Sequence, residues 1–285
     1  MSDGHCRIDR AFIRVEDGLI HLRRVDGRAD ARPLVLLHAS PGSSRGLEAL
    51  MTALAATPGA PPLIAPDMPG NGDSDAFAPD SPDIGWYAAA LIALLDAMGL
   101  DQIDLYGTHT GARVACEVAA AHPDRICRLI FDGIADYPDD MRDLLLRNYA
   151  PEMTPDDYGT QFVWAFHFVR DQALHFPHFL RDPDHRLLSR AVPAAPELHA
   201  SVVEVLKGLT SYHKAYRAAF AYRAADRMRA IHAPAMLLSA DNELPTLRAA
   251  NAAFAAALND GRVEPVGRAM PAKAAAIARF LDWSA

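Results

Sequence analysis

Cysteine, excess positive charge and long hydrophobic runs are all scarce in this sequence. The 285 residues include an odd number of cysteines, and the spacing of Cys6, Cys116 and Cys127 matches no metal site. A formal net charge of −8 argues against nucleic acid or an anionic membrane surface as a partner. No apolar run reaches the roughly 18 residues of a membrane span, and the N-terminus has no secretory pattern. We therefore expect a cytoplasmic protein that binds neither nucleic acid nor membrane.

What is abundant is apolar sequence in short, regularly spaced segments. Hydrophobic residues make up 51% of the chain, enough for a large buried core. Apolar segments of strand length alternate with segments of helical period between residues 33 and 133, and again from residue 234 to the C-terminus. This alternation predicts an α/β fold with a doubly wound, mostly parallel sheet. The segment FIRVEDGLIHLRRVDG predicts an additional hairpin that turns at Asp17–Gly18.

The alternation is interrupted between residues 135 and 227. This stretch is helical and aromatic in character, with repeated proline breaks and no evident strand. We interpret residues 1–134 and 228–285 as the core of one domain, and residues 135–227 as a helical lid inserted into it. The sequence contains no internal repeat and no low-complexity linker.

Three motifs follow predicted strands, at the sheet edge where open α/β folds bind ligands. They are HASPGSS (38–44), PDMPGNGDSD (66–75) and GTHTG (107–111). Their order and spacing resemble those of the α/β-hydrolase superfamily, in which the third motif usually reads Gly-x-Ser-x-Gly. The resemblance covers nearly the whole chain. It implies an oxyanion hole formed by the backbone N–H groups of Ser40 and Thr110, with Gly107 and Gly111 permitting a sharp strand-to-helix turn.

The chain departs from the superfamily pattern at the nucleophile and at the base. His109 replaces the serine, and no histidine occurs beyond His232, where the family's base is expected, so a Ser-His-Asp relay cannot operate. Alignment of the strand end places Glu243 at the acid position. Asp241 is the competing choice, and Asp132 lies at the position that some lidded members use, one strand earlier.

A histidine at this turn can replace the relay by itself. An imidazole with its ordinary pKa of about 6.5 is mostly neutral at pH 7 and needs no second base. The positive end of the following helix favours the neutral ring, and a carboxylate from Glu243 or Asp132 would fix its tautomer. The sequence therefore supports a cofactor-free enzyme that cleaves an ester, lactone or C–C bond of a small, partly apolar or aromatic molecule. A proton-abstracting lyase or isomerase and a non-catalytic binder with a decayed site are the alternatives.

The predicted lid supplies the candidates for substrate binding. Trp164, His167, Arg170 and Tyr216 could face the cleft, although most lid aromatics are expected to pack the lid against the body. His38 joins them as a residue that orients the oxyanion loop. Arg268 is either a surface charge or a clamp for a substrate carboxylate.

We expect no metal and no cofactor, because four closely spaced histidines of the predicted lid fit no ligand pair of a helix and no paired carboxylate lies near them. These histidines are His167, His175, His178 and His185. The expected partner is a small-molecule substrate, and a homodimer is one assembly that the sequence allows.

Overall fold

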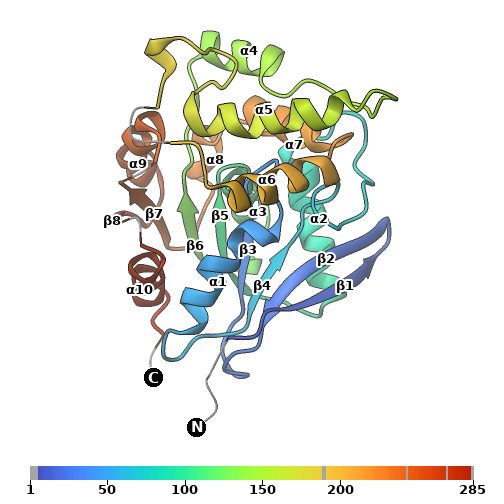
Figure 1. The fold of residues 1–285 in the computed structure, drawn as a ribbon. Coiled ribbons are helices and arrows are strands. Elements are labelled where there is room, and N and C mark those ends of the chain that lie inside the picture. The colour runs from blue at the N-terminus through green and yellow to red at the C-terminus, as the bar shows by residue number, and fades with distance from the viewer. Residues whose placement is uncertain (1–5, 188–190, 242, 268, 284–285) are drawn as a thin grey trace.

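The computed structural model describes residues 6–187, 191–241, 243–267 and 269–283. Its centre is an eight-stranded sheet in the order β1-β2-β4-β3-β5-β6-β7-β8 (Figure 1). Strand β2 is antiparallel to β1 and β4, and the remaining neighbours are parallel, which confirms the predicted fold class. The strands are β1 (Asp9–Val15), β2 (Gly18–Val25), β3 (Leu34–Leu37), β4 (Leu63–Pro66), β5 (Ile103–Thr108), β6 (Ile126–Asp132), β7 (Ala235–Ala240) and β8 (Gly261–Val266).

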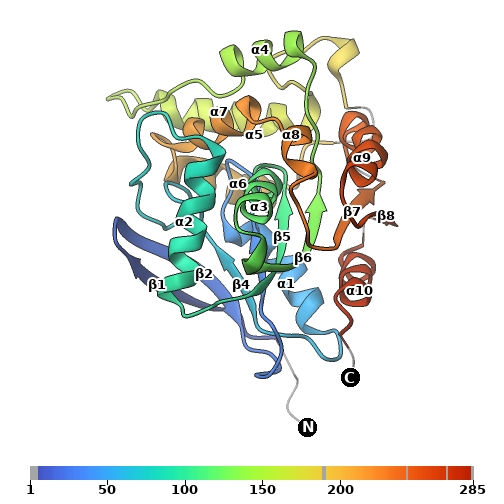
Figure 2. The ribbon, with the colours of Figure 1, turned by 180° about the vertical axis from the view of Figure 1, so that it is seen from behind.

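Helices cover both faces of the sheet, as the apolar strands require. All four residues of β3 are buried, so each face of this strand needs a hydrophobic layer. Helices α2 (Ile84–Ala97), α3 (Thr110–Ala121) and α9 (Pro245–Ala257) contribute to the core on one face. Helices α1 (Glu48–Ala55) and α10 (Met270–Phe280) pack on the other. Figure 2 shows α2 and α3 in front of the central strands, and Figure 1 shows α1 on the opposite side.

The first hairpin forms, but its turn differs from the prediction. Val15 pairs with Gly18, so the two-residue loop is Glu16–Asp17 and Gly18 opens the second strand. The prediction assumed that Asp17–Gly18 supplies a positive φ, whereas none of these residues is among those with positive φ. A side chain at Gly18 would instead meet Phe77, 2.8 Å from the added Cβ. Gly18 thus permits a close packing contact and not a turn.

The stretch between β6 and β7 forms a helical layer above the carboxyl ends of the strands (Figure 1). It contains α4 (Asp139–Asn148), α5 (Thr160–Leu174), α6 (Ala195–Lys207), α7 (Tyr212–Ala221) and the short α8 (Ala225–Met228). We call residues 135–227 the helical insertion. Its helices have an aromatic core of their own, built around Phe168, Tyr212 and Tyr216.

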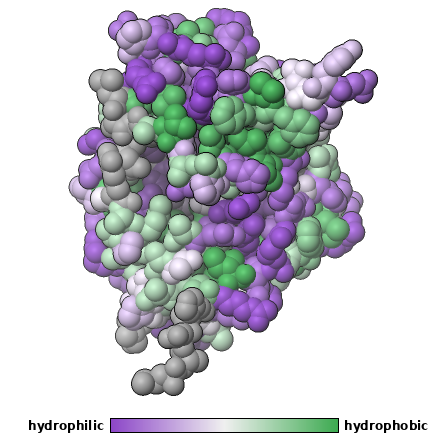
Figure 3. Space-filling view, in the orientation of Figure 1, coloured by the Kyte–Doolittle hydropathy of each residue, from purple (hydrophilic) through white to green (hydrophobic). Residues whose placement is uncertain are grey.

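The outer surface of the helical insertion carries exposed hydrophobic side chains. Phe162, Val163 and Phe166 of α5 are exposed, and Figure 3 shows hydrophobic residues gathered over this helix. Within the described residues, no helix combines the length and hydrophobicity that a membrane crossing requires.

Candidate active site

His109 occupies the bend between β5 and α3. Its backbone has φ 48° and ψ −106°, a region that side-chain-bearing residues rarely adopt. The bend is tight because a Cβ at Gly107 would lie 2.3 Å from the carbonyl oxygen of Gly111, and a Cβ at Gly111 would lie 2.5 Å from that of Leu37. Both glycines are therefore needed for close backbone approach, which confirms the predicted elbow geometry.

The imidazole of His109 projects from this bend and meets Glu243. Nε2 of His109 lies 3.3 Å from Oε2 of Glu243, and their side chains are 42% and 10% exposed. The other carboxylate oxygen, Oε1, accepts a hydrogen bond of 2.7 Å from the backbone N–H of Leu244. Gly133, with φ +84°, lies against both groups: a Cβ there would be 2.8 Å from Oε2 of Glu243 and 3.1 Å from Cε1 of His109. The absence of a side chain at Gly133 lets this pair form.

The two other candidate acids have different surroundings. Oδ2 of Asp132 accepts hydrogen bonds of 2.5 Å from the hydroxyl of Tyr106 and from Nζ of Lys273. Burial, and next the charge of Asp132, raises the pKa of Tyr106 well above its ordinary value, so this phenol remains a donor. Asp241 is exposed. Among the described carboxylates, it is Glu243 that contacts His109. Arg268 lies outside the described residues.

His38 holds the loop that was expected to supply one oxyanion donor. Its ring is buried; Nδ1 donates to the carbonyl oxygen of Ala39 (2.9 Å) and Nε2 accepts from the N–H of Met68 (2.9 Å). Burial lowers the pKa of His38, although the charge of Asp67 opposes this. A neutral ring with one donor and one acceptor fits these contacts. His38 therefore contacts main chain through both nitrogens and positions the loop.

The backbone amides of Ser40 and Thr110 are free of partners within the described part of the chain. Both residues line the same cavity as His109. The hydroxyl of Ser40 is likewise without a hydrogen-bond partner, although the residue is only 8% exposed. Two unpaired amides that line one cavity with an exposed imidazole can stabilise a developing oxyanion.

The cavity around His109 has a volume of about 200 Å³, and aromatic side chains form part of its wall. Side chains of the helical insertion form much of this wall: Tyr137, Tyr149, Phe176, Tyr216 and Phe220. Burial raises the pKa of Tyr137, while the charge of Arg113 lowers it and that of Glu243 raises it. We call this space the His109 cavity.

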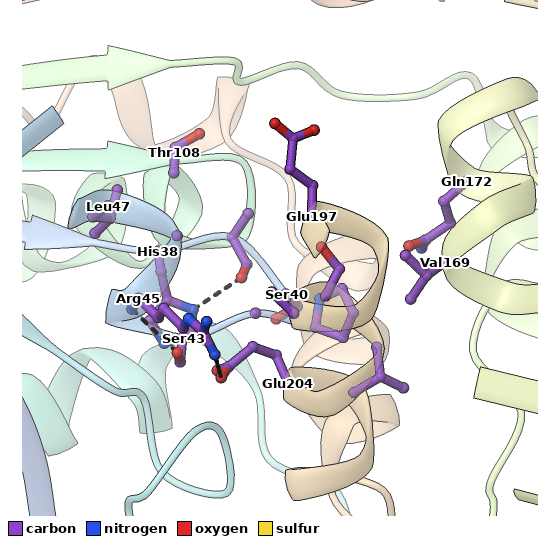
Figure 4. Close-up of a pocket in the computed structure, with 17 residues that line it drawn as sticks. His38, Ser40, Ser43, Arg45, Leu47, Thr108, Val169, Gln172, Glu197 and Glu204 are labelled. Carbon is purple, nitrogen blue, oxygen red and sulfur yellow. Dashed lines mark hydrogen bonds and ion pairs between the residues drawn. The ribbon is translucent and has the colours of Figure 1, made fainter. Parts of the chain in front are cut away.

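A second cavity of about 490 Å³ adjoins the first and is shown in Figure 4. The two share Ala39, Ser40 and Gln172 in their walls. Helix α6 contributes Glu197 and Glu204 to the second cavity, and Oε1 of Glu204 lies 3.9 Å from Nη1 of Arg45. The two cavities therefore meet at Ser40.

Of the four insertion residues predicted to bind substrate, Tyr216 lines the His109 cavity. The other three line neither of these cavities, so the expectation that they face the cleft needs correction. Trp164 stacks on Phe168 with ring centroids 4.9 Å apart. Arg170 donates to the carboxylate of Asp171 (2.8 and 3.0 Å), and His167 makes an edge contact with Phe166. These three side chains of α5 thus point toward other residues of the insertion and toward solvent.

Gln172 and Arg113 are among the residues that the structure places at the His109 cavity and that sequence reasoning missed. Gln172 of α5 donates to the hydroxyl of Tyr216 (2.9 Å). Arg113 of α3 lies one helical turn beyond His109 and is 5% exposed. The spacing of four residues from His109 is a usable signal for Arg113, whereas nothing in the sequence distinguishes Gln172 from the polar residues beside it.

One cluster in the described residues has the side chains to hold a metal ion: His21, Asp67 and Asp73. Its polar atoms are already bonded, since Nδ1 of His21 lies 2.8 Å from Oδ2 of Asp67 and Nε2 accepts from Nε of Arg10 (2.9 Å). The carboxylate of Asp73 pairs with Lys207 at 2.9 Å. These contacts hold the loop of the second motif in place. They explain why the three side chains lie together without a bound ion.

Comparison with known proteins identifies the family. The model of the α/β hydrolase fold matches residues 32–264. The chain belongs to this family. A 2-hydroxy-6-oxononadienedioate/2-hydroxy-6-oxononatrienedioate hydrolase of Dechloromonas aromatica (strain RCB) is 31% identical over 131 residues, 43% of each protein. The chain thus matches less than half the length of this curated relative.

Solved structures agree in fold over nearly the whole chain. Epoxide hydrolase A from Mycobacterium thermoresistibile superimposes with a TM-score of 0.71 at 19% identity, covering 97% of this chain and 98% of that one. The enol-lactonase from Burkholderia xenovorans LB400 has a TM-score of 0.67 at 17% identity, covering 95% and 100%. At such identities the likeness concerns the fold.

Proposed function

We propose that this chain is a cofactor-free hydrolase that cleaves an ester, lactone or C–C bond of a small, partly apolar or aromatic molecule. His109 is the reactive residue, Glu243 orients its ring, and the amides of Ser40 and Thr110 hold the oxyanion. The helical insertion acts as the lid of the site. The observation that carries the proposal is the half-exposed imidazole of His109, in contact with Glu243 and in one cavity with two unpaired amides.

The contact with Glu243 supports different roles for the two ring nitrogens. A carboxylate beside Nε2 favours the tautomer that carries its proton there, which leaves the lone pair on Nδ1. Nδ1 takes a proton from water, and the resulting hydroxide adds to the substrate carbonyl. The carbonyl electrons move to the oxygen held by the amides. When the tetrahedral intermediate collapses, the imidazolium returns its proton to the leaving group. Direct attack by Nδ1, giving an acyl-imidazole that water hydrolyses, is the covalent version of the same role.

The test is a panel of aryl and alkyl esters, lactones and β-diketones, assayed with the wild type, His109→Ala and His109→Ser. We expect turnover by the wild type and a loss of about 10³-fold or more in kcat for both variants. Replacement of His122, which caps the other end of the same helix, serves as the matched control and should leave kcat unchanged.

The alternatives give different results in the same experiment. Incorporation of one oxygen from H₂¹⁸O into the product supports hydrolysis, while turnover without incorporation points to a lyase or isomerase. Normal turnover by His109→Ala removes the histidine from the mechanism. A wild type that binds panel members but turns none over would be a small-molecule binder, and the hydrolytic proposal would be abandoned.

A further inference from the structure

Arg113 is a buried guanidinium without a carboxylate partner. Nη2 donates to the carbonyl oxygen of Ala135 (2.6 Å), and Nη1 lies 3.4 Å from that of His109. Nε has no partner, and no described carboxylate lies within ion-pair distance. The comparably buried Arg23 differs, because its Nε contacts Glu48 at 2.6 Å. Arg113 thus keeps its charge out of water with carbonyl contacts alone.

An arrangement of this kind is unfavourable unless something else pairs with the charge. A guanidinium has five N–H donors and is always charged, and the burial of an unpaired charge strongly destabilises the folded state. The two carbonyl contacts hold the group in place but do not neutralise it. A planar guanidinium with unused donors is best matched by a carboxylate, which it can bind through two parallel hydrogen bonds.

The position of Arg113 indicates where that carboxylate comes from. Arg113 lines the His109 cavity and follows the proposed reactive residue by four positions. The lining of this cavity also includes aromatic side chains, Tyr149 and Tyr216 among them. A ligand that matches both kinds of side chain has an apolar or aromatic body and a carboxylate a few bonds from the reacting carbon.

We propose that Arg113 binds the carboxylate of the substrate, so that the enzyme acts on carboxylic acids with an apolar or aromatic body. This rests on the proposed function, in that the His109 cavity is taken as the substrate site. Helix α3 packs against the sheet and begins directly after His109, so a carboxylate bound by Arg113 is held at a fixed distance from His109.

The experiment measures binding, which is independent of turnover. Isothermal titration calorimetry at pH 7.5 and fixed ionic strength compares phenylacetate, 3-phenylpropanoate and 4-phenylbutanoate with their primary amides. The proteins are the wild type, Arg113→Met, Arg113→Lys and Arg45→Met. Arg45 is the matched control because it lines the adjoining cavity and is paired with Glu204. Arg113→Lys retains the charge, so it keeps the test informative should Arg113→Met not fold.

We expect the wild type to bind at least one acid about tenfold or more tightly than its amide, and Arg113→Met to bind the two about equally. Arg113→Lys should keep part of the preference, and Arg45→Met all of it. A purely structural Arg113 would weaken acid and amide alike, and an unchanged ratio in Arg113→Met would overturn the proposal. So would a wild type without preference for any acid, or a preference that depends on Arg45. Acid preference without turnover of any ester would retain Arg113 as an anion site and reject only the hydrolytic function.

Discussion

Oε2 of Glu243 lies 3.3 Å from Nε2 of His109, across a glycine that leaves no side chain between them. The contact joins the end of β7 to the bend after β5, two strands that are separated in the sheet by β6. Under the proposed function, Glu243 holds the superfamily's acid position and orients an imidazole at the elbow instead of one after the last strand. His109 then takes the place of two residues, the nucleophile and the base.

The first prediction separates the two candidate acids. Glu243→Gln should lower kcat by about 10²-fold or more, because an amide no longer favours the reactive tautomer of His109, with little effect on the melting temperature. Asp132→Asn should lower the melting temperature with little effect on kcat, because the carboxylate of Asp132 binds Tyr106 and Lys273 in the core. Removal of that charge leaves Lys273 partly buried and unpaired, at a cost of about 3 kcal/mol in the free energy of unfolding.

Kinetics and thermal denaturation of the two variants side by side provide the measurement. Asp241→Asn is the control for a nearby but exposed acid and should leave both quantities unchanged. If Asp132→Asn lost kcat while Glu243→Gln kept it, the orienting role would belong to Asp132.

The second prediction concerns the strained backbone of His109. At φ 48° and ψ −106° a side-chain-bearing residue costs about 1 to 3 kcal/mol, whereas glycine adopts the region freely. His109→Gly and His109→Ala both lose the imidazole and its contact with Glu243. The difference in their free energies of unfolding therefore measures the cost of the backbone conformation. We expect the glycine variant to unfold about 2 to 4 °C or more above the alanine variant, with both inactive. Equal melting temperatures would mean that the bend stores no strain.

The third prediction follows from the unpartnered hydroxyl of Ser40. A buried hydroxyl without a hydrogen bond destabilises the fold by about 1 to 3 kcal/mol, so Ser40→Ala should raise the free energy of unfolding slightly. If the hydroxyl donates to the oxyanion together with the amide, the same variant loses about tenfold in kcat with KM nearly unchanged. Ser43→Ala is a comparison within the same loop, because the hydroxyl of Ser43 accepts a hydrogen bond from the N–H of Arg45 and its loss should lower stability. A Ser40→Ala variant with full kcat restricts the donors to the amides.

The fold and the elbow could be predicted because both depend on local sequence. Period and spacing of apolar residues determine which faces are buried, and the glycines around His109 mark a turn that any side chain would obstruct. Which side chains of α5 point toward the cavity could not be predicted in the same way. The rotation of this helix depends on how the insertion packs on its own aromatic core, so Trp164 points into that core while Gln172 reaches the cavity.

The contacts of the charged residues at the site could not be predicted from the sequence either. Which of Glu243, Asp241 and Asp132 meets His109 depends on side chains from three loops, and sequence alignment ranked them without a distance. Arg113 is buried because the helical insertion packs against α3. This contact joins segments far apart in the sequence, so no local pattern predicts it. Local rules thus located the bend at His109, and tertiary packing determined its surroundings.

The last prediction concerns stability against pH and involves Asp104 in β5. Burial raises the pKa of this carboxyl to about 6, although Arg32 opposes the shift from 3.5 Å, and Oδ1 has no hydrogen-bond partner. In the unfolded chain an aspartate titrates at about 3.9. Between these values the folded state binds a proton that the unfolded state does not, so the free energy of unfolding falls as pH rises through this window and stays low above it.

Asp104→Asn removes the charge and keeps the shape. Above pH 6 we expect a gain of about 1 to 3 kcal/mol, and at pH 4, where Asp104 is protonated in the folded state, no gain. Denaturant unfolding at pH 4.0, 5.0, 6.0 and 7.5 measures the difference, with Asp101→Asn as the exposed control just before the strand. A loss of stability at pH 7.5 would contradict the prediction, because it would mean that attraction between Asp104 and Arg32 exceeds the cost of burying the carboxylate.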